Sequence, residues 1–241
     1  MPTSKSPLEQ QHDEDSVSAG PMATGRFAVG PQEADPGVTA KFAKYIDHPL
    51  VFHWKGDTFV FAPFNHGNLD ASKFHKGFGG DLYVFAPGNM GNVSAEDHDV
   101  KSVRDVDKGW FNEHASAKVA LDSDVFIYAP NNKGTIHGAS SADASAYAEA
   151  VSKFGHAKAE ADAKADAHVL IYNPNNTGHV SADVAADAKA LALADGYKSA
   201  MTEANAYAHT SAEITADPSV LNQFKLMSMM SGYGHLLDAW A

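Results

Sequence analysis

The chain has 241 residues, 44% of them hydrophobic, with a formal net charge of −12 and a pI of about 5.4. This length suits one large domain or two small ones, and the acidic charge argues against nucleic acid or an anionic membrane as a general partner. The chain has no cysteine, which excludes disulfides, thiolate metal sites and a cysteine nucleophile. Neither a run of about 18 apolar residues nor a Sec-type leader is found, so the sequence predicts no transmembrane segment.

The first segment, residues 1–37, is rich in Ser, Pro, Gly, Gln and acidic side chains. A segment of this composition cannot bury enough apolar surface to offset its chain entropy, so we expect a disordered acidic arm. The alternative is an arm that orders on a neighbouring subunit. Residues 38–216 contain internal repeats and are predicted to form one repeat-built β domain.

The repeat-built segment opens with two short apolar runs, 50–54 and 59–62, on either side of Lys55-Gly56-Asp57, which predicts a hairpin. Four Pro-x-Asn-x-Gly motifs follow apolar runs, and the last spacings, about 43 and 44 residues, are typical of structural repeats. Proline presets φ for a turn, and we expect a positive φ at Gly134 and Gly178. The motif residues are Pro63, Asn65, Gly67, Pro87, Asn89, Gly91, Pro130, Asn132, Gly134, Pro174, Asn176 and Gly178.

Small residues, mostly alanine, occupy nearly every second position from about residue 138 to residue 216. A period of two is the strand period, and each change of phase coincides with a turn signal. We therefore predict a mainly β fold, an up-and-down antiparallel meander of long Ala-alternating strands. Because alanine is the best helix former, the alternative is a set of repeated β-turn-α units with Ala-rich helices that begin near Val93 and Val180.

The pattern changes in residues 217–241. Asp217-Pro218 is a helix-start signal, and Val220, Phe224 and Met227 recur at helical spacing. This predicts an amphipathic C-terminal helix.

Motifs for catalysis and metal binding are missing from the sequence. It contains no phosphate loop, nucleotide fingerprint, nucleophile elbow or zinc-protease motif, so we predict no enzyme, no catalytic residue and no cofactor. The 13 histidines do not recur at fixed offsets, which argues against a metal ladder. Asp-x-Asp pairs could bind calcium weakly, although such pairs are more often a solvated strand face. They are Asp97/Asp99, Asp105/Asp107 and Asp122/Asp124.

A second class of turn combines glycine with lysine and aromatic residues. In a meander these turns would collect along one rim, where aromatics between lysines suit stacking on sugars. A polysaccharide is therefore a candidate partner, and the alternative function is a glycan- or polymer-binding module. The simpler interpretation is that the aromatics cover the end of the sheet. The rim residues are Trp54, Lys76, Phe78, Trp110, Phe154 and Tyr197.

The alanine face leads to the main functional hypothesis. Burial of methyl groups gains little against the entropy of ordering a long strand, so we expect another layer to cover Ala146, Ala163, Ala188 and Ala206. The leading hypothesis is a structural protein that self-assembles with other copies of itself into a fibre, layer or extracellular matrix after export by a non-Sec route; a cytoplasmic location is also compatible. A pore-forming β-hairpin protein ranks third, because alanine is a poor lipid-facing residue.

Overall fold

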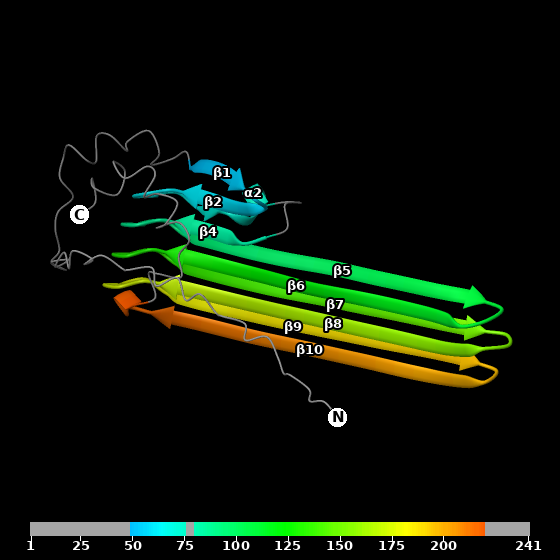
Figure 1. The fold of residues 1–241 in the computed structure, drawn as a ribbon. Coiled ribbons are helices and arrows are strands. Elements are labelled where there is room, and N and C mark those ends of the chain that lie inside the picture. The colour runs from blue at the N-terminus through cyan, green and yellow to red at the C-terminus, as the bar shows by residue number, and fades with distance from the viewer. Residues whose placement is uncertain (1–48, 76–79, 220–241) are drawn as a thin grey trace, which may run out of the picture.

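The computed structural model describes residues 49–75 and 80–219, and these form two β-sheets that lie face to face (Figure 1). Sheet A has the strand order β1-β2-β4-β6-β8-β10, and sheet B has the order β3-β5-β7-β9. The short elements are β1 (Leu50–Trp54), β2 (Asp57–Phe61), β3 (Leu69–Asp70), α2 (Ser72–His75) and β4 (Leu82–Phe85). The long strands are β5 (Val93–Gly109), β6 (Glu113–Tyr128), β7 (Ile136–Ser152), β8 (His156–Tyr172), β9 (Val180–Gly196) and β10 (Ser199–Thr215).

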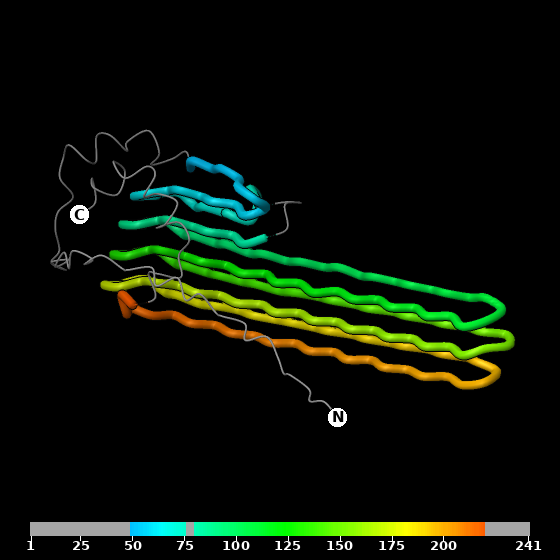
Figure 2. Tube along the Cα trace, viewed as in Figure 1, coloured from blue at the N-terminus to red at the C-terminus, as the bar shows by residue number. Residues whose placement is uncertain are grey.

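The chain winds as a flattened coil. Each turn of the coil adds one strand to sheet B and then one strand to sheet A, and the successive turns of the coil form a stack. Every long strand pairs in parallel with the strand one turn away: β5 with β7, β7 with β9, β6 with β8, and β8 with β10. Sheet B strands run toward three short turns, residues 110–112, 153–155 and 197–198, which we call the tip. Sheet A strands run back toward the Pro-x-Asn-x-Gly loops, which we call the loop end (Figure 2).

The prediction of a mainly β fold with very long strands is confirmed, and so is the hairpin, since β1 and β2 pair antiparallel. The antiparallel meander is wrong. Consecutive long strands lie in opposite sheets, and their hydrogen-bonded neighbours are 43 or 44 residues away in sequence. A period of two identifies a strand and its two faces but not its pairing partner, because the same turns can join neighbours in one sheet or cross between two.

The β-turn-α alternative is also wrong, because the segments that begin at Val93 and Val180 are β5 and β9. The acidic arm of residues 1–37 and, from residue 220 onward, the predicted C-terminal helix lie outside the described residues.

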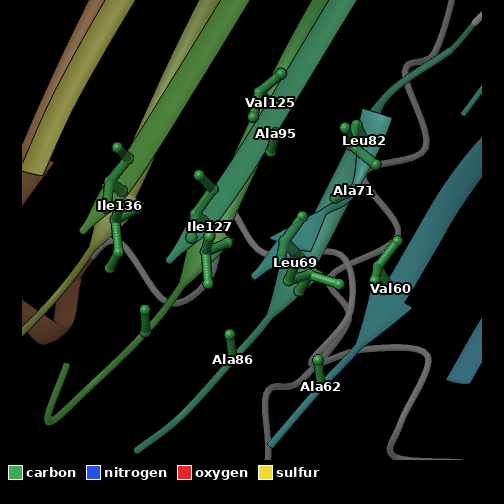
Figure 3. Packing of buried hydrophobic residues seen from close by; sticks show 14 of the residues in the cluster. Val60, Ala62, Leu69, Ala71, Leu82, Ala86, Ala95, Val125, Ile127 and Ile136 are labelled. Carbon is green, nitrogen blue, oxygen red and sulfur yellow. The ribbon is translucent and has the colours of Figure 1, made fainter. Parts of the chain in front are cut away.

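The interior between the sheets has two parts. Near the loop end, large side chains such as Leu69, Leu82, Ile127 and Ile136 form one buried cluster (Figure 3). From there to the tip, the buried cluster is almost entirely alanine, contributed by β6, β7 and β8. Because alanine is small, the two sheets can approach more closely toward the tip than at the loop end.

Side-chain ladders tie the coils together. On the outer face of sheet A, rings stack from strand to strand, for example Phe61 on Phe85 at 4.9 Å and Phe85 on Tyr128 at 4.7 Å between centroids. In the loops, Asn89 Nδ2 donates to Asn132 Oδ1 at 2.7 Å, and Asn132 Nδ2 donates to Asn176 Oδ1 at 3.0 Å. Such ladders require parallel, in-register stacking, because equivalent residues must lie directly above one another.

The expected positive φ at Gly134 and Gly178 is wrong. The left-handed residues of the last two loops are Asn131 and Asn175, with φ of 58° and 57°. Gly134 is needed for a different reason, since a Cβ there would collide with the backbone carbonyl of Gly91 in the preceding loop. Glycine is therefore needed at this motif position because it allows the loops to stack closely, and not because the turn requires a positive φ.

Candidate assembly surface

The last strands of the two sheets are β9 and β10. We call the backbone edges of these two strands that face away from β7 and β8 the open edge. Within residues 49–75 and 80–219, β9 pairs only with β7, and β10 pairs only with β8. The consequence for burial is large: Ile171 of β8 is 0% exposed, whereas Ile214, its partner one turn later on β10, is 49% exposed. Among the described residues, the last turn of the coil thus has the inward face of a core strand without a further layer that covers it.

The alanines predicted to form an assembly face are divided by the structure. Ala146 and Ala163 are buried between the two sheets of the chain itself. Ala188 on β9 is half-buried, and Ala206 on β10 is exposed. The second layer that covers most of the alanine face is therefore part of the same chain, and the alanines that stay accessible are those of the last turn.

The other side of the stack is built differently. Here β4 and β3 cover only the loop-end parts of β6 and β5. The remainder, residues 113–124 of β6 and 95–109 of β5, has no further strand beside it among the described residues, and we call it the protected edge. Inward positions of β5 here carry mostly charged side chains, namely Asp97, Asp99, Lys101, Asp105 and Asp107.

Two of these aspartates take the place of a neighbouring strand for β6. The Ser116 backbone N–H donates to Asp105 Oδ2 at 2.7 Å, and the His114 N–H donates to Asp107 Oδ2 at 3.0 Å. The carboxylates thus occupy N–H groups that would otherwise be available to a foreign strand. Charges that point inward at an edge are a known device against edge-to-edge association.

A buried polar network continues the protected edge toward the loop end. Asp97 Oδ2 accepts from Ser123 Oγ at 2.7 Å, and Asp97 Oδ1 lies 3.0 Å from Nε2 of His75 on α2. Burial on its own would lower the pKa of His75, but the nearby carboxylates of Asp97 and Asp99 outweigh it and raise the pKa above its ordinary value. Burial, followed by the charge of Asp97, raises the pKa of Asp99.

At the tip, three of the predicted rim residues come together. Trp110 and Phe154 stack with ring centroids 5.6 Å apart, the Lys153 ammonium lies 4.5 Å from the Trp110 ring, and Tyr197 follows on the next turn. All three aromatics are at least half exposed, as is Phe111, which the sequence analysis did not single out. Trp110 was predicted as a rim residue because it follows Lys108-Gly109 in a turn. Phe111 is the next residue of the same turn, so it could have been predicted in the same way.

The rest of the predicted rim is not at the tip. Trp54 lies at the β1–β2 turn, where its pairing partner Asp57 is level with residue 124 of β6, nearer the loop end than the tip turns (Figure 1). Lys76 and Phe78 lie outside the described residues.

The outer face of sheet A holds an open hollow of about 570 Å³ lined by Asp122, Asp124, Asp166, His168 and His209, among others. Burial, then the charges of Asp81 and Asp166, raises the pKa of Asp122. Across the described ranges, no group of three or more His, Asp or Glu side chains is arranged to hold a metal ion. The three Asp-x-Asp pairs are thus separated in role: two belong to the protected edge and one to this outer face.

Comparison with protein-family models, with curated proteins and with solved structures finds no match. Among residues 49–75 and 80–219, no helix has the length and apolar character that crossing a membrane requires.

Proposed function

We propose that the chain is a structural protein whose copies associate through the open edge. The observation that carries this proposal is the contrast between β8 and β10: the two strands pair in register over their full length, yet the inward residues of β8 are buried and those of β10 are exposed. A long strand with an unpaired edge and an apolar inward face is a template for pairing with another chain.

The gain from covering this edge has two sources. Each alanine methyl removed from water contributes ~0.8 kcal/mol, so the five exposed inward alanines of β10 contribute ~4 kcal/mol. These are Ala200, Ala204, Ala206, Ala208 and Ala212. The second source is pairing of the free backbone groups along two strands of 17 residues, each bond adding about 0.5–1.5 kcal/mol. Both gains arise without rearranging the fold, because the edge strands are already ordered.

The test places a charge on the inward face of the edge strand. In Ala206→Lys the ammonium must either be buried in the interface or keep the second chain away, so we expect association to weaken by about 100-fold or more. The matched control is Asn205→Lys, the adjacent residue on the outward face, which is expected to associate like the wild type. Sedimentation at several protein concentrations measures both.

Two results would count against this function. One is a wild-type chain that stays monomeric at every concentration. The other is equal association of the two lysine variants, which would mean that the interface does not include the inward face of β10.

A second candidate function rests on the tip, where Trp110, Phe154 and Tyr197 are exposed on successive tip turns and Lys153 lies over the Trp110 ring. Exposed aromatic rings bind the faces of sugar rings, so the tip is a candidate site for a glycan or a related polymer. Trp110→Ala is expected to abolish binding on a glycan array, whereas Trp54→Ala, at the separate β1–β2 turn, is expected to keep it. Binding that is lost in both variants or in neither would exclude the tip.

A further inference from the structure

We infer that the open edge takes the open edge of a second copy, so that assembly closes at two chains, with β10 of each copy paired antiparallel to β9 of the other. This inference rests on the proposed function, and it adds the partner, its orientation and the size of the assembly.

The first step is the choice between the two edges of the second copy. A chain that stacked head to tail would place the protected edge on the open edge. The inward alanines of β10 would then face a layer that carries Asp97, Asp99, Lys101, Asp105 and Asp107. In addition, the N–H groups of His114 and Ser116 on β6 are already bound to carboxylates and are not available to a new strand. Head-to-tail growth therefore meets charge and blocked hydrogen bonds, whereas the open edge of another copy presents neither.

The second step is the symmetry of a contact between two open edges. Such a contact is made by the same surface on both chains and has a two-fold axis, so it leaves no open edge for a third copy. The axis can be perpendicular to the sheets, which places β10 beside the second β10 with tip against loop end. Alternatively, it can be parallel to the strands, which places β10 beside the second β9 with tip against tip. Both arrangements pair the strands antiparallel. The perpendicular axis reverses the direction of the second β10, and with the parallel axis β9 runs toward the tip whereas β10 runs away from it.

The distance between the two sheets favours pairing of β10 with the second β9 over pairing with the second β10. At the loop end of the last turn, the inward residues are Val180 and Val184 on β9 and Ile214 on β10, whereas near the tip they are Ala194 and Ala200. The sheets must be farther apart where the larger side chains lie between them. Pairing β10 with the second β10 would join the thick part of one chain to the thin part of the other. Pairing β10 with the second β9 joins thick to thick and thin to thin.

The inward phase of the two strands also agrees with this pairing. Inward residues are even-numbered on β9, from Ala182 to Ala194, and even-numbered on β10, from Ala200 to Ile214. An antiparallel register therefore exists in which every inward residue of one strand meets an inward residue of the other. The alanine interior of the two chains then becomes continuous, and both tips, with Tyr197 nearest the two-fold axis, lie at the same end.

The test uses the absence of cysteine, which allows a single label on the full-length chain. Lys198→Cys places a nitroxide at the exposed last tip turn, and pulsed dipolar spectroscopy measures the distance between the two labels of an assembly. With tips together, we expect less than about 25 Å. With tip against loop end, the labels would be separated by nearly the length of a 17-residue strand, about 50 Å. Lys133→Cys, in the loop one turn of the coil farther from the open edge, calibrates the measured distances. The distance between its two labels is expected to be about 10 Å longer than that between labels on the last loop, because each chain adds one strand spacing.

Sedimentation of the same labelled samples gives the number of chains. A dimer with a short Lys198 distance supports the inference. A dimer with the long distance, or an assembly that continues to grow with concentration, would overturn the inference and leave the proposed self-association standing. A monomer would overturn both.

Discussion

Both edges of the stack are formed by long strands that pair in parallel with the next turn of the coil, but the edges differ in what their inward positions carry. On β5 these positions are mostly aspartate and lysine, and the carboxylates of Asp105 and Asp107 bind N–H groups of the neighbouring β6. On β10 they are alanine, threonine and isoleucine, and they are exposed. The comparison teaches that, in a fold made of similar stacked layers, inward charges on one edge can occupy the N–H groups that would otherwise pair with a further strand.

The largest expected effect comes from the same substitution in the middle of the stack and at the open edge. Ala163→Leu inserts a larger side chain between closely spaced sheets and should lower the free energy of unfolding by ~1–3 kcal/mol. At the exposed Ala206, leucine should change the stability of the monomer by less than ~0.5 kcal/mol. Chemical denaturation at low protein concentration measures both variants, and equal losses would show that the last turn is as tightly covered as the middle one.

The second prediction concerns a variant that reduces the difference between the edges. In Asp105→Ala/Asp107→Ala, the N–H groups of Ser116 and His114 lose their acceptors, which should reduce stability by ~1 kcal/mol for each bond. It should also expose a second apolar edge, so that sedimentation shows species larger than the wild-type assembly. If the double variant assembles like the wild type, the aspartates are not what limits stacking.

The third prediction concerns pH and the protected edge. Because the folded chain raises the pKa of His75, this histidine contributes stability that is fully present below its ordinary pKa of 6.5 and is lost as pH rises through the higher folded value. Burial lowers the pKa of His168 on β8, so the contribution of this histidine to stability is present above 6.5 and is lost as pH falls. The stability difference between wild type and His75→Gln should therefore shrink from pH 6 to pH 8, whereas that for His168→Gln should grow. Urea denaturation across this range gives the two slopes, and slopes of the same sign would contradict the assignment.

The smallest effect is expected on the outer face of the open edge. Asp187 and Lys189 form an ion pair on β9, and both side chains are more than half exposed. Exposed pairs of this kind contribute little, so Asp187→Asn should change both stability and association by less than ~0.5 kcal/mol. Thermal melting and sedimentation check the two values. A large loss of association would indicate that the interface includes the outer face of β9 and not the inward face.

The alternation of alanine predicted the strands and their faces because side-chain direction in a strand is a local property. Pairing is not local: the predicted meander pairs sequential neighbours, whereas the chain uses partners 43 or 44 residues away. The repeat did contain this information, since the nearly equal spacings of 43 and 44 residues between Asn89, Asn132 and Asn176 are what an in-register ladder needs. The protected edge could also have been found, because Asp105 and Asp107 fall in the inward phase of their strand. We interpreted them as part of a solvated face, because the sequence of this strand alone does not show that the edge of β6 lies beside it without a neighbouring strand.

The parallel register of the long strands makes the response of the molecule to mechanical force depend on direction. Tension between the tip of one strand and the loop end of its neighbour loads all their hydrogen bonds together in shear. Tension along the stacking direction that is applied at one end of the strands loads these hydrogen bonds one after another, so neighbouring turns of the coil separate progressively. Two chains joined at β9 and β10 would keep this property, and the assembly would be strong along its strands and weak across them.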